Sequence, residues 1–137
     1  MIYNVYKNIS NGDFESVKTR LLDLDDLILQ SFPDKLTHQA RVDESDYLVL
    51  NFKFVEQSKF RGNLAIMYED LPGNITFCVG ILKALDIDGM RLYKKEVIAE
   101  NINVDSLRNR ILELFALAIQ KYQLWSVEDL RSQSPYQ

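Results

Sequence analysis

The stretch ITFCVGILKALDIDGMRLYKKEVI, residues 75–98, decides the fold class of this chain. Its first eight residues alternate large apolar side chains with small or polar ones, a period of two that is typical of a strand with one buried face. Asp86-Ile87-Asp88-Gly89 then predicts a hairpin turn, because Asp-Gly accepts the positive φ angles of tight turns. The residues from Arg91 to Ile98 are then expected to form the return strand. The stretch therefore predicts an antiparallel β-hairpin.

Further alternating runs precede this hairpin. Residues 47–55 and 62–68 both place large apolar side chains at every second position, so each strand has one buried side and one side facing solvent. The turn at residues 70–74 contains Pro72-Gly73, a dipeptide that favours tight turns. A weaker run at residues 39–43 indicates an additional strand. We therefore expect four or five antiparallel strands.

Helical patterns flank the strands at both ends. In residues 14–28 the apolar side chains recur at steps of three and four, and Pro33 ends the pattern. A second amphipathic pattern begins after Asn103 or Asp105 and runs to about Trp125. The order helix, strands, helix predicts an α+β fold, a four- or five-stranded antiparallel sheet with an N-terminal and a C-terminal helix packed on one face.

Length and composition exclude several classes of protein. The 137 residues, 47% of them hydrophobic, predict a single domain over 1–137 with a flexible polar tail at 131–137. No stretch approaches the roughly 18 uncharged apolar residues that a membrane span needs, and the start lacks the features of a signal peptide. The lone Cys78 excludes an internal disulfide and a thiolate metal cluster. We expect a cytoplasmic protein without membrane contacts.

The net charge of −4 is unevenly distributed along the chain. Residues 11–50 contain nine acidic and four basic side chains, a balance that repels nucleic acid and attracts a basic protein. Three of the acidic residues lie on the predicted first helix, and three lie just before the strand at residues 47–55. Together they predict a partner-binding surface. Its acidic residues are Asp23, Asp25, Asp26, Asp43, Glu44 and Asp46.

No pattern of catalytic or cofactor-binding residues is present. His38 is the only histidine, so a two-histidine metal site is excluded, and its place in a polar turn predicts a surface residue. Cys78 lies within an apolar strand, where a cysteine behaves as a small buried hydrophobe. The glycines are far apart, which excludes a phosphate-binding loop. We therefore expect no cofactor, no metal and no enzymatic activity.

The face of the sheet opposite the helices is the other candidate surface. Tyr47 and Tyr93 are candidate aromatic anchors for a partner on this face, since aromatic residues are enriched at interface cores. Binding of single-stranded nucleic acid is a minor alternative. It requires Lys53, Arg91 and Lys94 on one exposed surface together with aromatic side chains.

The C-terminal part carries a resemblance. The hairpin from Asp86 to Tyr93, then Val97, and then Asp105-Ser106-Leu107 opening a helix that ends near Trp125 resembles the C-terminal part of type III secretion chaperones. The resemblance implies an acidic cytoplasmic α+β protein that masks a secreted effector. Small acidic immunity proteins, which neutralise a toxin, share the same overall profile.

The sequence therefore favours a non-enzymatic acidic module that masks a specific protein partner. That partner would be a basic toxin or secreted effector, bound in the manner of an immunity protein or a secretion chaperone. The alternative is a small-ligand-binding protein or enzyme with a pocket between the sheet and the helices, which would use His38 or an aspartate as its polar group. A homodimer stays open, because an exposed strand edge or helix face could self-associate.

Overall fold

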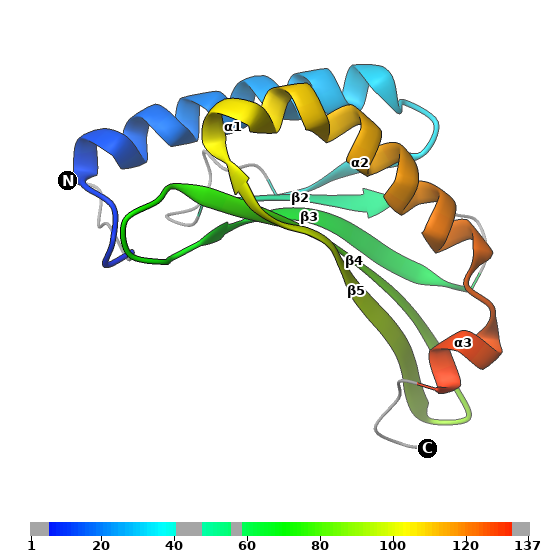
Figure 1. Ribbon diagram of the computed structural model, residues 1–137. Helices are drawn as coiled ribbons and strands as arrows, with labels where there is room; N and C mark the ends of the chain where they lie inside the picture. Colours follow the sequence, from blue (N-terminus) through cyan, green and yellow to red (C-terminus); the bar gives the residue numbers. More distant parts are fainter. Residues whose placement is uncertain (1–5, 41–47, 56–58, 133–137) are drawn as a thin grey trace.

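A computed structural model of the chain describes residues 6–40, 48–55 and 59–132 (Figure 1). The elements follow one another in the order helix, five strands and two helices. Their bounds are α1 Asn11–Ser31, β1 Leu36–Ala40, β2 Val49–Phe54, β3 Arg61–Glu69, β4 Thr76–Ile87, β5 Met90–Asn103, α2 Val104–Leu124 and α3 Val127–Arg131.

The five strands form one antiparallel sheet in the order β1-β2-β3-β4-β5, so each strand pairs with the next one along the chain. This arrangement confirms the predicted α+β fold. The weak strand expected at residues 39–43 is β1, which begins earlier, at Leu36. Leu36 is buried and lies opposite Phe54, so apolar burial brings the start of the strand to this residue. Residues 41–43 of the predicted strand lie outside the described part of the chain.

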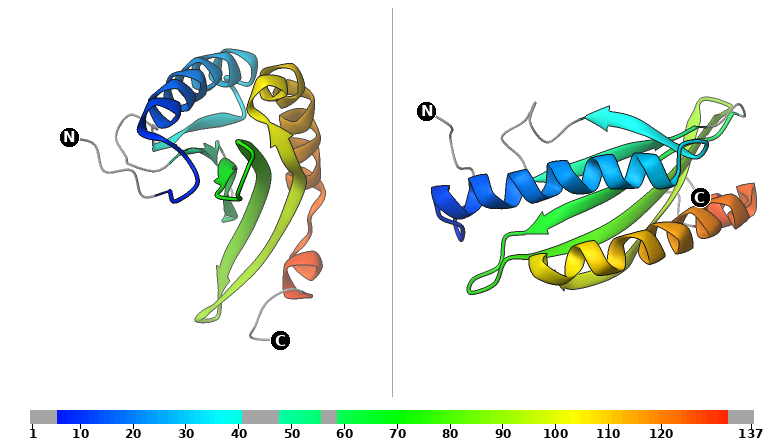
Figure 2. Two further views of the ribbon diagram at one scale, coloured as in Figure 1. Left: turned by 60° about the vertical axis from the view of Figure 1, so that its left-hand side comes forward. Right: turned by 90° about the horizontal axis from the view of Figure 1, so that it is seen from above.

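Helices α1 and α2 pack against the same face of the sheet. Their buried stripes, which include Phe14 and Leu21 of α1 and Ile111 and Phe115 of α2, meet the inward side chains of the strands in one core. Figure 2 shows the two helices side by side along that face, while the sheet bends away from them. The opposite face is therefore the inside of the bend.

Strand β5 is six residues longer than the predicted strand Arg91–Ile98, and five of the extra residues lie at its C-terminal end. Its pairing with β4 shifts twice, between Phe77 and Val79 and between Val79 and Gly80. A shift of register moves side chains to the other face, so the alternation breaks down before the strand ends. Asn103 then caps α2 by accepting the amide of Asp105 through its side chain.

The β4–β5 hairpin extends beyond the main body as an arm that carries α3. Leu85, Leu92 and Leu130 form a second small core between the arm and α3. Ser126 and Asp129 cap this helix reciprocally in a capping box. The sequence pattern did not predict α3, and Arg131, expected in the polar tail, is its last residue. Ser132 is the C-cap of α3, and residues 133–137 of the predicted tail lie outside the described part of the chain.

Candidate functional site

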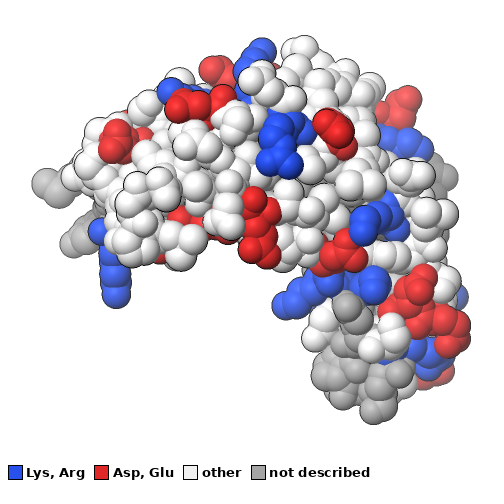
Figure 3. Space-filling model, viewed as in Figure 1, with Lys and Arg blue, Asp and Glu red and all other residues white. Residues whose placement is uncertain are grey.

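The concave face of the sheet is the main candidate site. None of the described helices covers it, and in Figure 3 it forms the hollow between the main body and the lower arm. A cavity of about 610 Å³ lies on this face. It is lined by Val49, Asn51, Asn63, Ala65, Met67, Gly80, Ile81, Leu82, Lys95, Glu96 and Val97.

Small side chains produce the hollow. The strand registers place Asn51, Ala65, Gly80 and Val97 in one row across β2, β3, β4 and β5. Ala65 and Gly80 occupy its middle, where the side chains are smallest, and the terminal methyl of Met67 lies 3.3 Å from the place of a Gly80 Cβ. Val97 is 50% exposed at the end of the row. The centre of the concave face is therefore an apolar depression.

One end of the concave face is basic. The neighbouring row runs from Lys53 through Asn63 and Leu82 to Lys95, and both lysines are exposed. Beyond this row, Arg61 and Arg91 both bind Asp86. The hydrogen bond from Arg91, followed by the charges of both arginines, lowers the pKa of the Asp86 carboxyl. We call the set Lys53, Arg61, Asp86, Arg91 and Lys95 the basic end.

The other end is acidic. Glu69 of β3 lies opposite Thr76, and its Oε1 accepts the backbone amide of Asn101 at 2.9 Å. Burial, and then the negative charges of Glu69 and Glu100, raise the pKa of the Cys78 thiol. We call Glu69 and Glu100 the acidic end. Because burial and the acidic end both favour the thiol, Cys78 has none of the features of an activated nucleophile.

The three aspartates predicted on the polar side of α1 do not stay together. Asp23 and Asp26 are exposed, as expected for a docking surface. Asp25 is fully buried, so its assignment to the exposed acidic surface is wrong. It lies on the apolar stripe of the helix, four residues after Leu21 and three before Ile28.

Asp25 forms a pair with the only histidine. Its Oδ2 lies 2.5 Å from Nε2 of His38, and the imidazole stacks on Phe52 at 6.1 Å between ring centroids. The side chains are 1% and 31% exposed for Asp25 and His38. The expectation that His38 lies in a turn is wrong, since His38 belongs to β1, and its side chain is only partly exposed. The pair lies on the helix side of the sheet and joins α1 to β1.

The remaining predicted residues divide between two groups. Asp43, Glu44, Asp46 and Tyr47 lie outside the described residues. Tyr93 pairs with Ala84 beside the basic end, on the concave face, and is partly exposed.

The minor alternative of nucleic-acid binding needs Lys53, Arg91 and Lys94 on one surface. Lys53 and Arg91 belong to the basic end. Lys94 pairs with the buried Lys83 on the helix side, and its Nζ lies 5.2 Å from the centre of the Trp125 ring. The three residues therefore do not share a surface.

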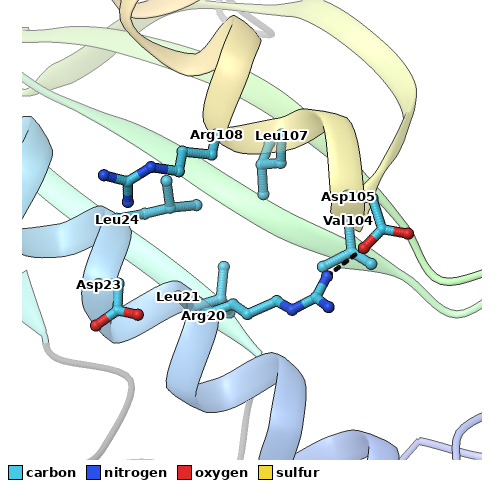
Figure 4. Close-up of a pocket in the computed structure, with 8 residues that line it drawn as sticks. All are labelled: Arg20, Leu21, Asp23, Leu24, Val104, Asp105, Leu107 and Arg108. Atoms are coloured by element: carbon cyan, nitrogen blue, oxygen red, sulfur yellow. Dashed lines mark hydrogen bonds and ion pairs between the residues drawn. The ribbon is translucent and has the colours of Figure 1, made fainter.

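A second hollow of about 330 Å³ lies between α1 and α2 (Figure 4). Leu21, Leu24 and Leu107 form its floor, and Nη1 of Arg20 binds Oδ1 of Asp105 at 2.5 Å across it. The ion pair joins the two helices at the surface. This notch lies between the helices, whereas the small-ligand alternative placed its pocket between the helices and the sheet.

Lys83 is the buried cation of the described residues. Its Nζ donates hydrogen bonds to the carbonyl oxygens of Tyr122 at 2.8 Å and Trp125 at 2.9 Å. The same ammonium lies 4.4 Å from the centre of the Phe60 ring. Because its donors meet the carbonyls at the end of α2, Lys83 fixes that helix end on the sheet.

No helix in the described part of the chain combines the length and the apolar character that a membrane span requires. Within the same residues, no three His, Cys, Asp or Glu side chains are grouped as metal ligands. Comparison of the chain with protein-family models, with curated proteins and with solved structures finds no match.

Proposed function

We propose that this protein is a non-enzymatic binding module that masks a specific protein partner by holding part of it on the concave face. The observation that carries the proposal is the depression of about 610 Å³, with an apolar centre between a basic and an acidic end. An apolar centre with a polar rim is the usual anatomy of a protein interface.

The shape of the depression favours a protein over a small ligand. Pockets for small molecules enclose most of the surface of their ligand. The concave face is instead an open trough across four strands, as Figure 3 shows from one side. A segment of a larger partner can fill the trough and be covered by the rest of that partner.

The proposed partner is a toxin or secreted effector with a basic surface, bound in the cytoplasm as an immunity protein or secretion chaperone would bind it. Asp23 and Asp26 on α1 support this proposal, because exposed carboxylates attract such a partner over long range. Asp43, Glu44 and Asp46 belong to the same proposal on sequence grounds. The concave face supplies the short-range contacts.

The test compares two variants of similar exposure. Val97→Asp places a carboxylate in the apolar centre, whereas Leu117→Asp alters the outer side of α2, where the leucine is 43% exposed. Proteins retained by the wild type are identified, purified and tested for inhibition of their own activity. We expect Val97→Asp to weaken binding and inhibition at least about tenfold, and Leu117→Asp to leave both unchanged.

Two outcomes would contradict the proposal. Equal binding and inhibition by wild type and Val97→Asp would exclude the concave face. Loss of binding in Leu117→Asp alone would move the interface to the helix layer. Size-exclusion chromatography of both variants shows whether a second copy of this chain is the occupant instead.

A further inference from the structure

The charge of the concave face changes along the strands. The basic end, the apolar depression and the acidic end follow one another along the strands, and in Figure 3 acidic side chains border the hollow on the body side and basic ones near the arm. A protein with a net charge of −4 therefore presents a local surplus of cations at one end of its hollow. The charge at close range is opposite to the charge that acts at long range.

Lys53 and Lys95 define what fits at the basic end. They stand in one row at the two sides of the trough, so their backbones are about 14 Å apart, three strand spacings of about 4.8 Å. Lys53 is exposed, and none of the ion pairs between described residues includes it. A carboxylate placed between the two side chains is attracted by both ammonium groups.

Asn51 distinguishes a peptide from a hydrocarbon chain. Its Oδ1 is buried at the edge of the depression and accepts no hydrogen bond from the described part of the chain. An acceptor without a donor costs roughly 1–3 kcal/mol, so an occupant gains affinity if the Asn51 side chain turns its buried oxygen toward an N–H of that occupant. A peptide carries such donors at every residue, whereas an acyl chain carries none.

We infer that the occupant of the concave face is a peptide segment of the partner that carries carboxylates next to a large apolar side chain. The apolar side chain fills the depression above Ala65 and Gly80, and an amide reaches Asn51. The carboxylates lie between Lys53 and Lys95. This inference rests on the proposed function and specifies the chemistry of the bound segment.

The test uses random 12-residue peptides displayed on phage and selected on the full chain. Enriched peptides are then synthesised, and their dissociation constants are measured by fluorescence anisotropy. We expect the selected sequences to combine Asp or Glu with a neighbouring aromatic or large aliphatic residue. Vesicles of anionic phospholipid serve as the competing probe and should not displace the peptides.

Two matched pairs of variants locate the binding. Lys53→Glu/Lys95→Glu should raise the dissociation constants of the peptides at least tenfold. Lys35→Glu/Arg110→Glu makes the same change in net charge at exposed sites elsewhere, and it should change these constants less than twofold. Ala65→Leu fills the depression and should weaken peptide binding by a similar factor. Ala116→Leu adds the same atoms to the exposed side of α2 and should have no effect.

The possible failures are distinguishable. Selection of purely basic peptides, or equal affinity for the Lys53→Glu/Lys95→Glu variant, overturns the inference, and so does displacement by the vesicles. If Val97→Asp still abolishes binding of the purified partner, the proposed function stands and only the chemistry of the segment is wrong. If neither peptides nor partner depend on the concave face, both are wrong.

Discussion

His38 holds the buried carboxylate of Asp25, and removing the imidazole alone should be costly. His38→Leu leaves Asp25 buried without this partner, so we expect the free energy of unfolding to fall by about 3 kcal/mol. In Asp25→Leu/His38→Leu both polar groups are absent, and much of the loss should be recovered. Urea unfolding at pH 7 measures the free energy of unfolding of the single and the double variant. Equal destabilisation of the single and the double variant would show that the two residues are not coupled.

Cys78 reports on the acidic end of the concave face. Burial and the charges of Glu69 and Glu100 raise the pKa of its thiol. The rate of alkylation by iodoacetamide should therefore keep rising at pH values where the rate for the urea-unfolded chain has levelled off. Glu69→Gln keeps an oxygen for the amide of Asn101, and it should shift the rate profile to lower pH. Lys35→Gln, a change far from the thiol in sequence, is the control and should leave the profile unchanged.

The buried position of Asp25 was present in the sequence and was missed. On a helix with 100° between residues, Asp25 falls beside Leu21 and Ile28, while Asp23 and Asp26 fall on the outer side. Treating three neighbouring aspartates as one charged group concealed this difference. The pairing with His38 could not have been predicted, because it depends on the register of β1, 13 residues further along the chain.

At the scale of the elements, Gly62 marks where β3 and β4 approach the end of α2. A Cβ atom at Gly62 would overlap the carbonyl oxygen of Leu82 and the ring of Tyr122. We expect Gly62→Ala to lower the free energy of unfolding by at least about 2 kcal/mol, because neither the strand backbone nor the packed ring can move freely.

The matched control for Gly62→Ala is Gly80→Ala. There the nearest atom to a new Cβ is the terminal methyl of Met67 at 3.3 Å, the far end of a flexible side chain. We expect a change within about 1 kcal/mol. Urea unfolding measures the free energy of unfolding of both variants. Equal destabilisation would contradict the close approach at Gly62.

Element type was predictable, but some element bounds were not. Four strands and two helices follow directly from apolar periodicities of two and of three to four. The predicted bounds of β1 were shifted because its apolar pattern is short. The predicted β5 was too short because the bulge opposite Val79 breaks the alternation of its side chains. Helix α3 has five residues, too few for a periodic pattern to be recognised.

For the whole molecule, the proposed attraction of a basic partner should depend on Asp23 and Asp26. Asp23→Lys/Asp26→Lys should slow association with the purified partner by about tenfold at low salt, and the difference should shrink as salt screens the charges. Glu113→Lys/Glu128→Lys, an equal charge change on α2 and α3, is the control. Stopped-flow association rates that fall equally for both variants would indicate an effect of net charge alone.

The sequence indicated a sheet with an open face, yet neither its curvature nor its charge pattern could be predicted. Residues 1–70 hold all of the excess acid, which suggested an acidic binding surface. The concave face draws its basic end from four strands, including Lys53 and Lys95, which are 42 residues apart. Only the pairing registers of the strands bring such residues together. A count of charged residues along the chain does not show that they share one face.

The strand order described above also bears on how the chain folds. Since every strand pairs with its successor, the sheet can grow by adding one hairpin at a time, and no strand has to wait for a distant segment. Helix α1 is different, because it precedes all five strands and packs on the finished face. A nascent chain would therefore keep the apolar stripe of α1 uncovered until the sheet is synthesised, the interval in which it is most exposed to aggregation.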